Sequence, residues 1–162
     1  IICGLVQPDE GHVRVNGKEI GKDVDFPENI GVIIEAPGFL PSLSAYKNLD
    51  YLASLRGVIG KEQIRSAISA VGLDPDDKKH VGKYSLGMKQ RLGIAQAIME
   101  DPDILILDEP MNALDKSGVA EIRELLLRLK GEGKTILIVS HNPEDIHMLC
   151  DTVHEMDGGK LC

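Results

Sequence analysis

The sequence predicts an α/β fold in which a mostly parallel sheet carries an inserted helical subdomain. Two stretches, 104–107 and 136–139 (the latter within a strand expected at 135–139), are apolar without alternation, and such runs suit strands buried on both faces of a parallel sheet. Between an earlier apolar run at 30–34 and the stretch at 104–107, the apolar residues recur at helical spacing. The helical subdomain is therefore expected over about 42–100, and the α/β core over 1–41 and 101–162.

The first forty residues are expected to form short strands. Residues 11–20 have the pattern of a hairpin with a turn at Asn16-Gly17. Residues 30–34 are predicted to form a buried strand that ends at Glu35. A loop rich in proline and glycine then leads to the helical segment.

Three helices are expected in the insert. The first begins after Ser44, a favourable N-cap, and ends near Gly57. The second covers about 61–71 and the third about 86–99, with a polar connector between them. The second half of the chain then alternates between strand and helix: a strand at 104–108, a helix at about 117–130, a strand at 135–139, a helix beginning at Asn142-Pro143, and a strand pair within 151–161 turned at Gly158-Gly159.

Composition limits the class of protein. The 162 residues are 43% hydrophobic and 27% charged, which predicts one globular domain with a sizeable core. The net charge of −8 disfavours a nucleic-acid-binding surface, so no nucleic acid partner is expected. The three cysteines form no CxxC pair, which favours a reduced, cytosolic setting. No apolar run approaches the roughly 18 to 20 residues that cross a membrane.

Two adjacent carboxylates, Asp108 and Glu109, close the strand at 104–108. Open α/β sheets bind ligands beyond the carboxyl ends of their strands. One acid can hold Mg²⁺ through its water shell, and the next can orient or deprotonate a water that attacks a phosphate. The pair indicates a nucleotide-hydrolysing site, although apolar runs that end in aspartate also occur in other α/β proteins.

A second site is indicated at the start of the helix at 86–99. Ser85 and Gly87 lie at this helix start, where backbone N–H groups and the helix dipole favour an anion. Ser85 can equally be an ordinary N-cap, and the pattern alone leaves both interpretations open.

Taken in order, these motifs resemble the ATP-binding domain of an ABC transporter, over almost the whole chain. A signature loop (85–90), a Walker B strand (104–109), a D-loop (112–115) and a switch histidine, His141, follow one another as in that family. The resemblance implies a P-loop NTPase-like fold with ATP and Mg²⁺ as ligands. The signature variant at 84–88, Tyr-Ser-Leu-Gly-Met, is similar to the branch that exports bacitracin, lantibiotics and other drugs or peptides through separate membrane subunits.

The resemblance also implies roles for single residues around ATP. Asp108 would hold Mg²⁺, Glu109 would polarise the attacking water, and His141 would contact the γ-phosphate. Glu35 stands where the family usually has a glutamine that contacts Mg²⁺ and the water, so it is a further expected metal ligand.

The family's ATP-binding domains pair head to tail, with ATP between them. Ser85 and Gly87 would therefore bind the γ-phosphate held by the partner, and Asp115 would lie at the dimer seam. The expected partners are a second ATPase domain and a membrane subunit, which would place the protein in the cytoplasm, on the inner face of the cell membrane.

The Walker A pattern G-x-x-x-x-G-K-[ST], whose backbone cradles phosphate, has no match in the 162 residues. The resemblance places that loop directly before Ile1, with at least one core strand. The chain is then truncated at its N-terminus and is expected to be inactive alone. The alternatives to an export ATPase are an inactive fragment of such a domain, or a translation-associated or DNA-repair ABC ATPase.

Overall fold

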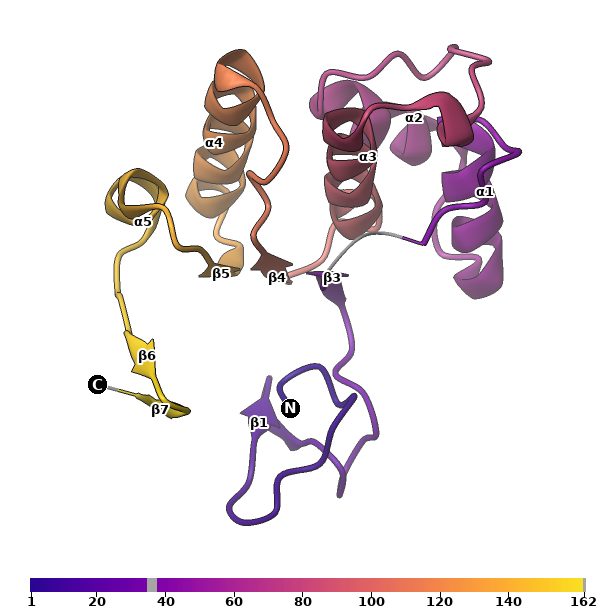
Figure 1. The fold of residues 1–162 in the computed structure, drawn as a ribbon. Helices are drawn as coiled ribbons and strands as arrows, with labels where there is room; N and C mark the ends of the chain where they lie inside the picture. The colour runs from indigo at the N-terminus through magenta and orange to yellow at the C-terminus, as the bar shows by residue number, and fades with distance from the viewer. Residues whose placement is uncertain (35–37, 162) are drawn as a thin grey trace.

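The computed structural model describes residues 1–34 and 38–161. Its centre is a parallel sheet of three strands, β3 (Ile30–Ile33), β4 (Ile104–Asp108) and β5 (Thr135–Val139), in the order β3-β4-β5. Figure 1 shows the three strands side by side, with helices α3 and α4 on one side of the sheet. The predicted α/β fold with a parallel core is confirmed.

The helical subdomain is inserted between β3 and β4, as predicted. It contains α1 (Ala45–Arg56), α2 (Lys61–Ala70), a short 3₁₀ turn (Val81–Lys83) and α3 (Leu86–Ile98). The Ser44 hydroxyl caps α1 by accepting from the Lys47 N–H, and Gly57 ends this helix with a φ of 65°. The three helices share a core in which Leu49, Ile68 and Leu92 are fully buried.

Helix α3 packs directly on the backbone of β3. A Cβ atom at Gly31 would lie 1.9 Å from the carbonyl oxygen of Ala97, so only glycine permits this approach. At the other end of the helix, Gly87 lies against Ala113, which follows β4. Helix α3 therefore runs antiparallel to the strands and places its N-terminus at the carboxyl edge of the sheet.

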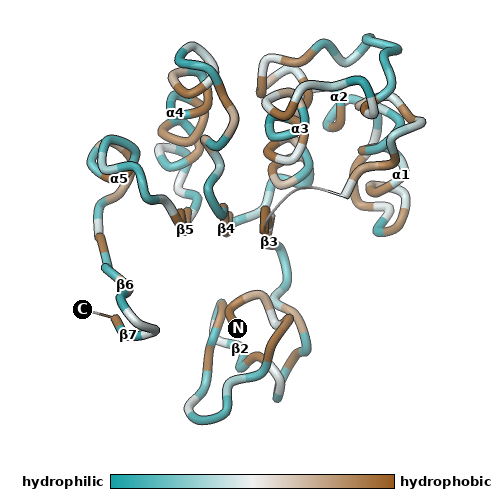
Figure 2. Tube along the Cα trace, in the orientation of Figure 1, coloured by the Kyte–Doolittle hydropathy of each residue, from teal (hydrophilic) through white to brown (hydrophobic). Residues whose placement is uncertain are grey.

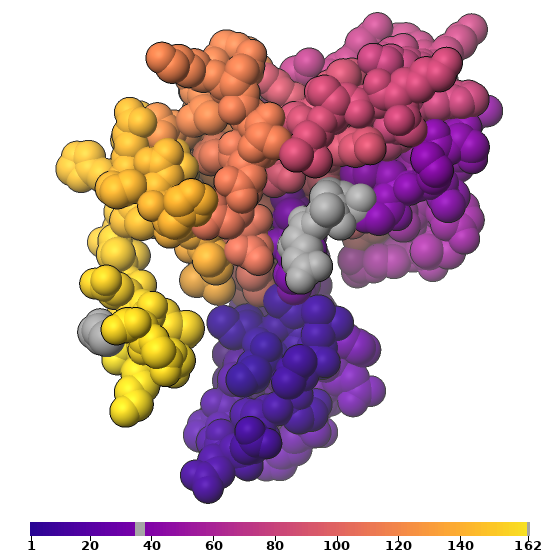
Figure 3. Space-filling view, in the orientation of Figure 1, coloured from indigo at the N-terminus to yellow at the C-terminus, as the bar shows by residue number. Residues whose placement is uncertain are grey.

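Two helices and two hairpins complete the fold. They are α4 (Lys116–Gly131), α5 (Pro143–Leu149), the hairpin of β1 (Arg14–Val15) and β2 (Lys18–Glu19), and the hairpin of β6 (Met156–Asp157) and β7 (Lys160–Leu161). The predicted turn at Asn16-Gly17 has positive φ values of 50° and 79° at its two residues, as a tight hairpin turn requires. Figure 3 shows the N-terminal segment and the β6–β7 hairpin projecting from the body of the molecule.

Strand β5 is less buried than its sequence predicts. The uninterrupted apolar run suggests burial on both faces, but Leu137 and Val139 are 43% and 53% exposed. The prediction is wrong because β5 is the edge of the described sheet and helices cover one face only.

Figure 2 shows the three apolar strands together in the middle of the molecule. In the described part of the chain, no helix is both long and apolar enough to span a membrane.

Candidate active site at the carboxyl edge of the sheet

Glu109, the first residue after β4, is held in an unusual backbone conformation. Its φ is 46°, in the left-handed region that residues other than glycine seldom adopt. Its N–H donates to the carbonyl of Val139 at 2.9 Å, and its own carbonyl accepts from the Asn112 N–H at 3.1 Å. Residues with a strained backbone of this kind are common in active sites, where the surrounding contacts fix the orientation of the side chain.

The Glu109 carboxylate is paired with His141. The Nδ1 atom of His141 lies 2.6 Å from Oε1 of Glu109, and the His141 backbone N–H donates to the same oxygen at 3.1 Å. The two residues meet because β4 and β5 are parallel neighbours, with Asp108 opposite Val139, so their carboxyl ends leave the sheet side by side. The His141 side chain is 79% exposed and the Glu109 side chain 27% exposed, so the pair faces solvent.

This contact changes the titration of the histidine. The hydrogen bond that the His141 ring makes to the Glu109 carboxylate, and then the negative charge of that carboxylate, raise the pKa of His141 above the ordinary value of 6.5. The pairing therefore contributes to stability fully below about pH 6.5, and the contribution is lost as pH rises through the raised pKa of the folded protein. Because the pair is exposed, water and salt keep this contribution small.

We expect the substitution Glu109→Gln to lower the pKa of His141 toward 6.5 in the nucleotide-free 162-residue protein. The amide removes the negative charge that stabilises the protonated ring. The measurement is a pH titration of the His141 ring by NMR in both proteins. An unchanged titration of His141 would show that the 2.6 Å contact does not persist in solution.

The start of α3 also lies at the carboxyl edge. The Ser85 hydroxyl accepts from the Met88 N–H at 3.2 Å, so Ser85 does act as the N-cap of this helix. Gly87 is packed so closely that a Cβ atom there would lie 2.7 Å from the carbonyl oxygen of Ala113. Capping and anion binding are compatible, because the first N–H groups of a helix have no partners within it.

Asp115 is the N-cap of α4. Its carboxylate accepts from the Gly118 N–H at 2.9 Å and from the Ser117 hydroxyl at 3.2 Å. The Gly118 N–H first, and then the Ser117 hydroxyl, lower the pKa of Asp115. The residue is therefore ionised at neutral pH, and its oxygens have partners within this chain.

Asp108 ends β4 and presents a partly buried carboxylate beside Glu109. Mg²⁺ is commonly bound by one or two carboxylates together with substrate phosphates and water, so a single aspartate at this edge fits the ion. No group of three or more His, Cys, Asp or Glu side chains among the described residues forms a metal-binding cluster. The other expected metal ligand, Glu35, lies outside the described residues.

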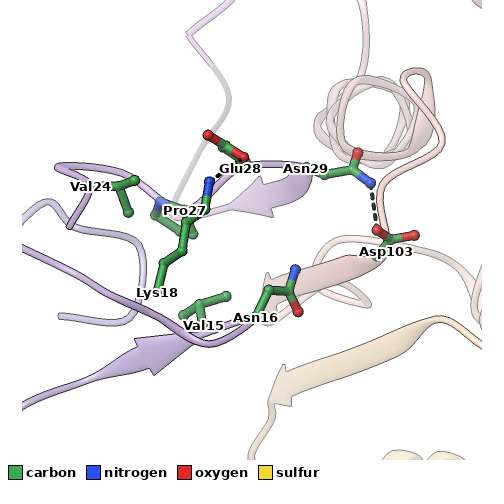
Figure 4. A pocket seen from close by; sticks show the side chains of 8 residues that line it. All are labelled: Val15, Asn16, Lys18, Val24, Pro27, Glu28, Asn29 and Asp103. Carbon is green, nitrogen blue, oxygen red and sulfur yellow. Dashed lines mark hydrogen bonds and ion pairs between the residues drawn. The ribbon is translucent and has the colours of Figure 1, made fainter.

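A cavity of about 200 Å³ lies elsewhere, at the amino edge of the sheet. Asn29 and Asp103, which precede β3 and β4, lie on its wall and share a 2.7 Å hydrogen bond. Figure 4 shows this contact and the Lys18–Glu28 ion pair on the same wall. Because Asp108 and Glu109 lie at the opposite edge, this cavity is separate from the candidate active site.

Two residues of α3 near the candidate active site, Gln90 and Arg91, are given no role of their own in the sequence analysis. The buried side chain of Gln90 donates to the carbonyls of Glu109 and Pro110. Arg91 joins α3 to its neighbours through the Val71 carbonyl and Glu121. A signal for Gln90 exists in the sequence, since its amide lies on the same helical stripe as buried Ile94 and Ala97 and requires polar partners there.

Comparison with known proteins places the chain in a family. The family model described as ABC transporter matches residues 1–112. The chain belongs to the ABC transporter family, as the order of its motifs predicts. It is 47% identical to YybJ of Bacillus subtilis (strain 168), named as an uncharacterized ABC transporter ATP-binding protein; the match covers 99% of the chain and 73% of that relative.

Two further relatives have names that mention a transported compound. One is the bacitracin transport ATP-binding protein BcrA of Enterococcus faecalis, 45% identical over 97% of this chain and 52% of BcrA. The other is the lantibiotic transport ATP-binding protein SrtF of Streptococcus pyogenes, 40% identical over 99% of this chain and 69% of SrtF. The chain thus spans about half the length of the bacitracin relative.

A solved structure supports the fold. The ATP-binding cassette MJ0796, described as a dimer in a post-hydrolysis state with ADP and Pi, matches with a TM-score of 0.77. The match covers 90% of this chain and 68% of that chain, at 23% sequence identity. At this identity the likeness establishes the fold alone.

Proposed function

We propose that this chain is part of an ATPase that drives export of a drug or peptide antibiotic through a separate membrane subunit. The observation that carries the proposal is the pairing of Glu109 with His141 beside Asp108, at the carboxyl edge of a parallel sheet. The names of the bacitracin and lantibiotic relatives support the substrate class.

In this proposal Glu109 is the general base. Its carboxylate accepts a proton from the attacking water, and its contact with His141 keeps it at the carboxyl edge of the sheet. His141, which is exposed, turns from Glu109 to the γ-phosphate when ATP binds. Asp108, with Glu35 as a second ligand, would hold Mg²⁺, which neutralises charge on the phosphates when bound.

The proposed active form is a head-to-tail dimer. The N-terminus of α3, with Ser85 and Gly87, would bind the γ-phosphate held by the partner, and Asp115 would lie at the seam. The dimeric description of MJ0796 supports this arrangement.

We also propose that residues 42–100 act as the signature subdomain on the core of 1–41 and 101–162. The transporter names of the relatives support a membrane subunit as partner, and a cytoplasmic site on the inner face of the membrane.

The phosphate-binding Walker A loop has no match in these 162 residues, and we propose that a further segment supplies it. Within the described residues β5 is an edge of the sheet, which supports this proposal because a strand that carries the loop could pair there. Leu137 and Val139 are exposed on β5 and would be covered by the elements that accompany such a strand.

We expect the 162-residue chain alone to bind Mg-ATP weakly or not at all. The missing Walker A loop supplies most of the backbone donors for phosphate. The measurement is isothermal titration with Mg-ATP, with circular dichroism to show that the chain is folded. Micromolar affinity in the folded chain would contradict the proposal that the loop lies outside it.

We expect cells that carry the complete protein and its membrane subunit to resist bacitracin or a lantibiotic better than cells that carry the Glu109→Gln variant. Export needs hydrolysis, and this substitution removes the proposed base. The measurement is the minimal inhibitory concentration of each compound. Equal resistance in the two strains, at equal protein levels, would exclude these compounds as substrates of an ATP-driven export.

A further inference from the structure

Gln90 holds the backbone that carries the proposed general base. The residue lies on α3 and is 9% exposed. Its Nε2 atom donates to the carbonyl oxygen of Glu109 at 3.3 Å and to that of Pro110 at 3.2 Å. A buried amide whose two protons go to consecutive carbonyls fixes the direction in which the chain leaves β4.

The direction of this backbone decides where the Glu109 carboxylate points. Glu109 has a left-handed conformation, which persists only where surrounding contacts stabilise it. On one side the Glu109 N–H is bound to Val139, and on the other its carbonyl is bound by Asn112 and Gln90. Of these contacts, the one from Gln90 is a side-chain contact from the helical subdomain.

The helix that carries Gln90 is also the helix that begins at the signature loop. Gln90 lies five positions after Ser85, which is about 7.5 Å along the axis at 1.5 Å per residue. Gly87 packs on the Ala113 carbonyl in the same region, with only 2.7 Å available for a Cβ atom. Helix α3 therefore touches the segment 109–113 at two points, through Gln90 and through Gly87.

We propose that Gln90 is a positioning residue that links the signature loop to the general base of the same chain. When the partner's nucleotide engages the start of α3, the Gln90 amide carries the Glu109 and Pro110 carbonyls with it. The base of one site is thereby set by the occupancy of the other. This link rests on the proposed role of Glu109.

The test is Gln90→Met in the complete protein, since methionine keeps the length of the side chain and removes both donors. We expect kcat for ATP hydrolysis to fall roughly 10-fold or more, because small displacements of a reacting group cost that much, while KM and ATP binding stay unchanged. If Gln90→Met does not fold, Gln90→Leu, which also lacks both donors, takes its place with the same expectation.

Asn48→Leu is the matched control. Asn48 is another buried amide of the helical subdomain, and it donates to the Leu40 and Ser44 carbonyls at 3.1 and 3.0 Å rather than to Glu109 or Pro110. Its loss lowers thermal stability as the loss of Gln90 does, but it should leave kcat unchanged. A fall in kcat of the same size in both variants would assign Gln90 a merely structural role and overturn the link.

Two further readouts separate positioning from stability. In a Glu109→Gln background, Gln90→Met should cause no further loss of turnover, because both act through one group. The pKa of His141 should fall toward 6.5 in Gln90→Met, since the displaced carboxylate no longer reaches the ring. If Gln90→Met hydrolyses ATP normally while Glu109→Gln is inactive, the proposed link is overturned and the proposed role of Glu109 stands. Near-normal turnover of Glu109→Gln would overturn the proposed base, and the link with it.

Discussion

Glu109→Gln in the complete protein should keep ATP binding and lower turnover by roughly 10²-fold or more, the scale of a lost general base. The amide has the size of the carboxylate and can still contact His141, but it cannot accept the proton of the attacking water. ATP should therefore persist between the two domains, and the dimer should accumulate. The measurements are phosphate release and gel filtration with ATP.

The control for this experiment is Glu124→Gln. Glu124 lies on the exposed side of α4 and loses the same charge outside the active site. Its turnover should equal that of the unmodified protein. Near-normal turnover in Glu109→Gln would assign the base to another residue.

Ser85→Arg should abolish hydrolysis in the complete protein while the monomer still binds ATP nearly normally. Ser85 caps α3 at the carboxyl edge, and in the proposed dimer it meets the nucleotide held by the partner rather than its own. Arginine removes the cap and occupies the space in which the γ-phosphate held by the partner would bind. ATP binding by the monomer and ATPase rate are both measured. Ser54→Arg, an exposed serine on α1, is the matched control.

Mixing tests whether Ser85 acts in trans. Ser85→Arg is combined with a complete subunit whose Walker A lysine is replaced, and ATPase rate is followed against the mixing ratio. In a mixed dimer, one of the two sites joins an intact Walker A loop to an intact signature loop, so partial activity should return. A rate that stays at baseline while mixed dimers form would argue against this assignment. Loss of ATP binding in monomeric Ser85→Arg would place the site in cis.

Much of the fold is visible in the sequence because it depends on local chemistry. The Asn16-Gly17 turn, the Ser44 cap and the three helices of the insert lie where turn residues, caps and apolar spacing predict them. The start of α4 differs by one residue from its predicted position, because Asp115 caps the helix and Lys116 begins it. Strand β5 is the exception, since a run of apolar residues does not tell which face has a neighbour.

By itself the sequence determined the class of fold, the family, and the adjacency of Asp108 and Glu109 at the end of a strand. These follow from apolar periodicity and from motifs that are short and local. Only the tertiary structure decided two contacts of Glu109. His141, 32 positions after Glu109, contacts its carboxylate, and Gln90, 19 positions before Glu109, binds its backbone carbonyl. Both contacts depend on how parallel strands and a crossing helix bring their ends together, which no local pattern encodes.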